Sequence, residues 1–118
     1  MNRAADYLRH MLEAARQACA YVEGLSRAEF LDDKRTQQAV ILNLVIIGEA
    51  ATKLMNDHPE TVDQWPSVPW RSMRGMRNRL THGYFDIDLD IVWDTVAMAL
   101  PGLVSELASK LPPPAEGA

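Results

Sequence analysis

Apolar residues recur every three or four positions along most of the chain, which is the spacing of one face of a helix. Over residues 2–24 they form a single stripe while charged residues occupy the other faces, and Gly24 is placed to end the segment. The stripe comprises Leu8, Met11, Leu12, Ala15, Cys19 and Val22. The pattern predicts an amphipathic helix of about six turns.

Residues 26–29 read Ser-Arg-Ala-Glu, the spacing of a capping box in which Ser26 and Glu29 reciprocally satisfy backbone amides. A short helical turn is expected to follow, with a break at Asp32 or Asp33. A second long helix is predicted over 34–56. It ends before Pro59, because the residue that precedes a proline is disfavoured in the helical conformation.

The centre of this second helix, residues 39–51, is apolar nearly all the way round and is interrupted only by Asn43, Gly48 and Glu49. A helix in a small domain has one face for its own core, so the surplus apolar surface is expected to meet a second copy of the chain. Gly48 fits close approach to another helix, since an interior glycine costs about 1 kcal/mol relative to alanine. Glu49 is either an exposed acid or a half-buried partner of an arginine.

The last third of the chain predicts two more helices. After an irregular connection over 60–69, Pro69 is well placed to start a third helix over 70–81, which Gly83 would end. One of the three acids at positions 86, 88 and 90 is expected to cap a fourth helix rather than to bind metal. Pro101 should break or kink that helix, and a short helical turn to Leu111 should follow.

The fold class is therefore all-α, an up-and-down four-helix bundle with short extra helical turns. Neither strand-like alternation nor internal repeats occur in the 118 residues, and a chain of this length has room for one domain. We expect residues 1–111 to form the helical domain and residues 112–118 to be a disordered tail.

Composition narrows the possible partners and the location. The formal net charge of −4 argues against general polyanion binding, so any contact with nucleic acid must be local. Cys19 cannot form an internal disulfide because it is the only cysteine. The N-terminus is charged and lacks a signal-peptide pattern, and no run approaches about 18 apolar residues. We expect a soluble cytoplasmic protein.

This acidic chain contains one cluster of basic residues. Four of the twelve basic residues lie between 71 and 79, and Arg71, Arg74 and Arg77 share a helical stripe that suits phosphates. His82 follows Arg77 by five residues, about 140° around a continuous helix. The two side chains could converge only if the helix unwinds at 81–83, which Gly83 would allow.

Such a cluster is suited to phosphodiester chemistry. A histidine ordinarily titrates near neutral pH and can transfer protons, while arginine binds phosphate and stabilises transition-state charge. RNA carries its own nucleophile in the 2′-hydroxyl, so no metal is required, and two His82 side chains across a dimer cleft could supply the acid and the base. Basic residues near a helix end also interact favourably with the helix dipole without any catalytic role.

Other residues with catalytic or binding potential have simpler explanations. His10 and His58 lie far in sequence from other ligand types, which disfavours a zinc site. The tryptophans Trp65, Trp70 and Trp93 are most simply core or interface anchors, although Trp70 could alternatively stack on a base.

The segment RNRLTHGYF at 77–85 resembles the signature of HEPN-domain ribonucleases of the HepT type. The resemblance extends to SRAEFLDD, NLVIIGEAATKL and DIDLDIVWDTV, in the expected order along the chain. It implies that Arg77 and His82 are the catalytic pair and that Asn78 helps to orient the site. It also implies a homodimer, without metal or cofactor, that cleaves RNA at the dimer cleft as the toxin of a type VII-like toxin–antitoxin pair.

The same resemblance implies that Tyr84 receives AMP from a partner nucleotidyltransferase of the MNT type. Adenylyl groups there would place phosphate charge beside Arg77 and His82 and compete with RNA. Arg71, Arg74 and Arg79 are the expected phosphate-binding residues. The alternative is a non-catalytic dimeric module that binds the nucleotidyltransferase or RNA without cleaving it.

Overall fold

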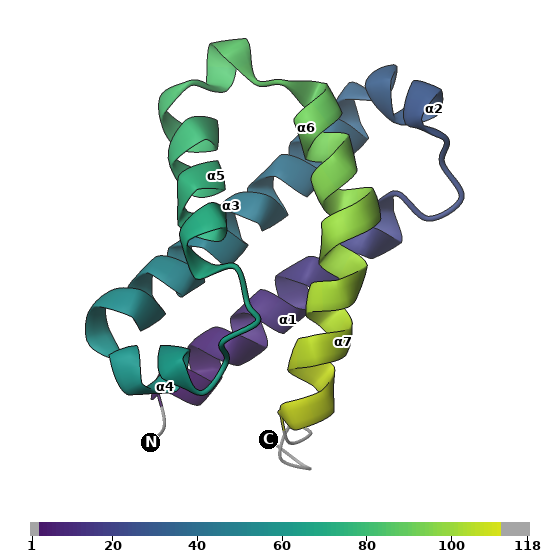
Figure 1. Cartoon of the computed structure of the whole chain (residues 1–118). Helices are drawn as coiled ribbons and strands as arrows, with labels where there is room; N and C mark the ends of the chain where they lie inside the picture. The colour runs from purple at the N-terminus through teal and green to yellow at the C-terminus, as the bar shows by residue number, and fades with distance from the viewer. Residues whose placement is uncertain (1–2, 112–118) are drawn as a thin grey trace.

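The structure, a computed structural model, describes residues 3–111, and over that range it contains helices, turns and no strand (Figure 1). This confirms the all-α bundle; the predicted tail at 112–118 lies outside the described residues. Two short helices and a 3-10 turn join four long helical segments. These segments are α1 (Arg3–Tyr21), α3 (Lys34–Asp57), α5 (Trp70–His82) and a continuous stretch of α6 (Leu89–Asp94), η2 (Thr95–Ala99) and α7 (Leu100–Lys110).

The central element is α3, which packs against α1 on one side and against α5 on another. Its N-cap is Asp33, whose carboxylate accepts hydrogen bonds from the Thr36 hydroxyl at 2.6 Å and the Thr36 N–H at 3.1 Å. These two bonds stabilise the charged form and lower the pKa of Asp33 below its ordinary value. At the other end the His58 N–H donates to the Leu54 carbonyl, and Pro59 follows.

The predicted capping box is present at the start of α2 (Arg27–Leu31). The Glu29 N–H donates to Ser26 Oγ at 3.1 Å, and the Ser26 N–H donates to Glu29 Oε1 at 2.8 Å. Arg27 then reaches α6, pairing with Asp90 at 2.6 Å and with Asp94 at 3.3 Å. Short α2 is thereby attached to the start of the last helical segment.

The connection between α3 and α5 is more ordered than the sequence predicted. Residues 59–63, most of which were expected to be irregular, form the short helix α4 (Pro59–Asp63) with Pro59 in its first turn. Beyond it Trp65 is buried, and its carbonyl accepts a hydrogen bond from the indole of buried Trp70 at 3.0 Å. The anchoring role predicted for both tryptophans is confirmed, and Trp70 is too buried to stack on a base.

The last helical segment differs from expectation at Pro101. Asp88 caps α6 as predicted for one of the acids, accepting from the N–H groups of Asp90 and Ile91. The helix does not break before Pro101, because the preceding turn, η2, is a π-helix in which the Leu100 N–H donates to the Thr95 carbonyl. A π-turn is one way to accommodate a proline that cannot join the regular ladder.

An open groove lies between α5 and the α6–α7 segment, and Leu44 and Ile47 of α3 also line it. Its volume is about 580 Å³, and its lining is mostly apolar, including Met73, Met76, Ile91 and Leu103.

Two helices, α3 and the continuous stretch over 89–110, are long and apolar enough to cross a membrane by length and composition alone. Core helices of soluble proteins pass the same test, and α3 is one of the core helices of this bundle. The cytoplasmic location stays a prediction.

Candidate active site at the crossing of α3 and α5

Arg77 lies where α5 crosses α3, and α3 holds its guanidinium. Nη1 lies 3.3 Å from the Glu49 carboxylate, and Nη2 donates to the Thr52 hydroxyl at 3.0 Å. Only 20% of the side chain is exposed. Among residues 3–111, Arg77 Nε is buried without a hydrogen-bond partner. Glu49 is therefore the arginine partner that the sequence left open, although its own side chain remains half exposed.

Gly48 makes this crossing possible. A Cβ added at Gly48 would lie 2.3 Å from Arg77 Cβ and 2.8 Å from the Met73 carbonyl oxygen, closer than real atoms approach. The close approach expected of Gly48 is thus confirmed, but it is made to α5 of the same chain. Thr52 completes the contact, because its hydroxyl accepts from Arg77 and donates to the Gly48 carbonyl at 2.8 Å.

Thr52 was missed by the sequence reasoning. Its only signal is its position four residues after Gly48 and three after Glu49, which places all three on one side of α3.

Three other candidate site residues of α5 differ in exposure. Arg71 and Asn78 are exposed and Arg74 is half-buried. Within the described part of the chain, neither Arg71 nor Arg74 forms a salt bridge. Both guanidinium groups therefore remain available to an anionic ligand beside Arg77.

Arg79 lies on a different side of α5. It lines the apolar groove with Met76 and Ile91, and it borders a second hollow with Asp86 and Asp88. Two residues along a helix correspond to a rotation of about 200°, which separates Arg79 from Arg77. The structure therefore gives no support for placing Arg79 on the same phosphate path as Arg71 and Arg74.

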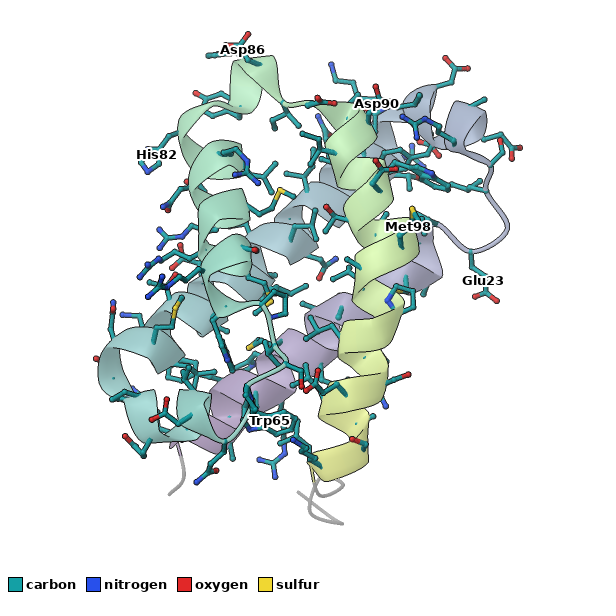
Figure 2. The ribbon with its side chains drawn as sticks, viewed as in Figure 1. Glu23, Trp65, His82, Asp86, Asp90 and Met98 are labelled. Atoms are coloured by element: carbon teal, nitrogen blue, oxygen red, sulfur yellow. The ribbon has the colours of Figure 1, made fainter. Side chains whose placement is uncertain are left out.

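The structure does not show the turn of His82 toward Arg77 that unwinding would allow. The helix does not unwind at residues 81–83: α5 includes His82, and the N–H of Gly83 donates to the Arg79 carbonyl at 3.0 Å. Gly83 has a φ of −131°, so its backbone is outside the left-handed region. His82 is exposed, and Figure 2 shows it pointing outward from α5. In one chain, Arg77 and His82 occupy different faces of a regular helix.

Beyond His82 the chain makes a tight turn that exposes two aromatic rings. The turn is the 3-10 helix η1 (Tyr84–Asp86), in which the Asp86 N–H donates to the Gly83 carbonyl at 2.9 Å. Tyr84 is 62% exposed and Phe85 88% exposed, and their ring centroids lie 4.5 Å apart. The Tyr84 hydroxyl, the predicted modification site, is on a side chain that a partner can reach.

The surplus apolar surface of α3 is smaller than the sequence suggested. Most of it is buried inside the chain, at Val40, Leu44, Ile47, Ala50, Ala51 and Leu54. What remains is the pair Leu42, 60% exposed, and Ile46, 38% exposed. They lie seven and three residues before Glu49, so this stripe continues directly to the Glu49–Arg77 pair. The homodimer itself stays a prediction.

Two of the three acids at positions 86, 88 and 90 have structural roles. Asp88 caps α6, and Asp90, which Figure 2 shows at the top of α6, pairs with Arg27. The part of the chain that the structure describes contains no group of three His, Cys, Asp or Glu residues arranged to hold a metal ion.

Comparison with known proteins identifies the family. Residues 11–109 match the model of the family described as HepT-like, ribonuclease HepT-like. A protein of Thermococcus cleftensis designated "Probable ribonuclease HepT" is 40% identical over 98 residues, which are 83% of this chain and 86% of the relative. A Methanocaldococcus jannaschii protein designated as a candidate RNase is 37% identical over 101 residues, 86% of this chain and 81% of the relative.

A similarly designated protein of Caldanaerobacter subterraneus subsp. tengcongensis is 32% identical over 107 residues, 91% of this chain and 93% of that relative. No solved structure matches the chain. A family match that spans most of the sequence, together with relatives at these identities, shows that the chain belongs to the HepT-like ribonuclease family.

Proposed function

We propose that this protein is a metal-independent endoribonuclease and the toxin of a type VII-like toxin–antitoxin pair. Family membership supports ribonuclease activity. The observation that carries the assignment of residues is the guanidinium of Arg77, held by Glu49 and Thr52 on the helix that ends in exposed His82. Arg77, Asn78 and His82 are the proposed catalytic residues, in a cleft shared by two protomers.

The proposed reaction uses the RNA as its own nucleophile. The 2′-oxygen bonds to phosphorus while the bond from phosphorus to the 5′-oxygen breaks, which yields a 2′,3′-cyclic phosphate and a 5′-hydroxyl. One His82 accepts the proton of the 2′-hydroxyl, and the His82 of the partner subunit, entering protonated, donates a proton to the leaving oxygen. Arg77 stabilises the charge that builds on the phosphoryl oxygens, and Arg71 and Arg74 bind flanking phosphates.

A second copy is needed because one chain supplies a single histidine here and points it away from Arg77. The exposed pair Leu42 and Ile46 is apolar surface that a homodimer would cover, and it borders the Glu49–Arg77 pair. Isologous packing through this stripe would bring helix α5 of both protomers to one cleft. A monomeric elution in sizing chromatography would remove the basis for a shared site.

Purified protein incubated with total RNA in EDTA tests the activity. We expect cleavage that leaves cyclic phosphate ends and that His82→Ala abolishes. His10→Ala is the matched control, because His10 is also an exposed histidine on a helix but lies on α1. Wild-type protein that leaves RNA intact would contradict the proposal and favour the non-catalytic module that binds the nucleotidyltransferase or RNA.

Silencing is proposed to act at Tyr84. A partner nucleotidyltransferase of the MNT type would transfer AMP from ATP to the tyrosine hydroxyl and release pyrophosphate. The added phosphate would lie two residues from His82 and repel RNA. Intact mass after coexpression with such a partner should show additions the size of AMP that Tyr84→Phe removes. Tyr21→Phe, at the other well-exposed tyrosine, should keep them.

A further inference from the structure

Phe85 is the most exposed large apolar side chain in the described part of the chain, at 88%. The other phenylalanine, Phe30, is fully buried and packs near Trp93 at a centroid distance of 5.4 Å. Phe85 therefore contributes almost no burial to the stability of the fold. Single exposed apolar residues are common on protein surfaces, so exposure alone assigns no role.

The position of Phe85 supplies a second observation. The turn that carries it is fixed by two backbone hydrogen bonds, from Gly83 to Arg79 and from Asp86 to Gly83. Phe85 is three residues from His82, so their Cα atoms lie within about 11 Å because a residue spans at most about 3.6 Å. Its neighbour Tyr84 presents a second exposed ring at 4.5 Å, tilted by 41°. Two exposed aromatic rings thus lie within three residues of the proposed catalytic histidine.

We propose that Phe85 is a base-stacking platform that selects RNA whose bases are unpaired next to the scissile phosphate. This inference rests on the proposed ribonuclease function and adds its substrate class. Proteins that read single-stranded RNA stack splayed bases on exposed aromatic rings, and any base can stack because every base has a π-face. Paired bases in an A-form helix are stacked on each other, so a duplex has no free base face for Phe85 to contact.

The arrangement of charge and apolar surface favours RNA over a protein at this position. Exposed Arg71 and half-buried Arg74 lie on the same helix that ends at His82, so phosphates and a base can be bound along one strand. The aliphatic exposed pair, Leu42 and Ile46, lies on α3 and is where the second protomer is proposed to pack. Trp70, the other candidate for stacking, is buried.

The test uses a labelled single-stranded RNA oligonucleotide of mixed sequence whose cleavage site is mapped with wild-type protein. Phe85→Ala should raise KM by about 5- to 150-fold, the range that follows from the loss of one base–aromatic contact, with kcat nearly unchanged. Phe85→Trp should restore KM. Met98→Ala is the matched control, because Met98 is 77% exposed on the last helical segment, away from α5 (Figure 2). This variant should leave KM unchanged.

An abasic scan identifies the contact as stacking. Removing the base at one position beside the cleavage site should cost wild type the same factor that Phe85→Ala costs, and should cost Phe85→Ala nothing further. A duplex of the same sequence should be cleaved poorly by both proteins.

Three results would overturn the inference while leaving the ribonuclease intact: an unchanged KM for Phe85→Ala, equal abasic penalties in both proteins, or a loss confined to binding of the nucleotidyltransferase. Wild-type protein that cleaves no RNA would instead overturn the proposed function and this inference together.

Discussion

Gly48→Ala should separate α3 from α5 and disturb Arg77. The added methyl group would meet Arg77 Cβ at 2.3 Å and the Met73 carbonyl at 2.8 Å, whereas ordinary contacts begin at 3.4 Å. Neither obstacle is the end of a flexible side chain, so the two helices must move apart by about 1 Å. Overpacking of this kind costs about 1–3 kcal/mol. The better helix propensity of alanine offsets about 1 kcal/mol of that cost.

The matched control is Gly102→Ala. Gly102 lies inside α7, and a Cβ added there has nothing within 4 Å. It should gain up to about 1 kcal/mol from helix propensity. The difference between the two variants therefore isolates the steric cost, about 1–3 kcal/mol. Urea unfolding followed by tryptophan fluorescence measures this difference in the free energy of unfolding. In a thermal melt, each kcal/mol should shift the melting temperature by about 4 °C for a domain of this size.

The same displacement should reduce RNA cleavage. Arg77 moves with α5 while Glu49 and Thr52 stay on α3, so a 1 Å shift changes both contacts to the guanidinium. Misplacement on this scale can lower a rate by about 100-fold. Gly102→Ala should cleave RNA at the wild-type rate. Two results would contradict these expectations: Gly48→Ala as stable as Gly102→Ala, or Gly48→Ala less stable but with unchanged kcat for RNA cleavage.

Further predictions follow from other contacts. Thr52→Val removes the acceptor of the Arg77 Nη2 hydrogen bond and should lower kcat/KM by about 10- to 100-fold without changing the fold, measured by RNA cleavage and circular dichroism. Glu49→Ala should lower kcat more than Glu49→Gln, which keeps an acceptor oxygen, while both change the free energy of unfolding by less than about 1 kcal/mol. Gly24 has a φ of +80°, so Gly24→Ala should destabilise the protein by about 1–2 kcal/mol in urea. Because the pKa of Asp33 is lowered in the folded protein, its carboxylate stabilises the fold at pH values above its unfolded-state pKa. This stabilisation is lost as pH falls through the folded-state pKa, so Asp33→Asn should reduce the loss of stability in acid.

Local signals in the sequence predicted the helices well. The capping box at Ser26 and Glu29 and the helix end before Pro59 are present, and one of the three acids at 86, 88 and 90, Asp88, is an N-cap. Each of these features depends on residues within one turn. The π-turn before Pro101 is different: it is a shift in backbone hydrogen bonding that apolar periodicity does not report.

The identity of the neighbour that covers each helical face could not be read from periodicity. The apolar centre of α3 indicated a large surface to be buried, and the structure shows that α1 and α5 bury most of it within one chain. Gly48 predicted a close contact with another helix, but not which helix makes it. The position of Thr52 one turn after Gly48 did not identify its role, because that role depends on Arg77, which α5 places against it.

The orientation of His82 is the difference that most affects the proposed mechanism. A helix that continues through His82 keeps that side chain about 140° from Arg77, so a single chain cannot bring the two together by the expected unwinding. A cleft that needs a histidine from each protomer gives a quantitative test by subunit mixing. If wild-type and His82→Ala chains are unfolded together in equal amounts and refolded, about a quarter of dimers carry two wild-type histidines. Cleavage should then fall to about a quarter of the activity of an all-wild-type sample at the same total concentration, since one acid and one base are both required. Activity near one half would show that each site needs only one histidine, and the shared acid and base would have to be abandoned.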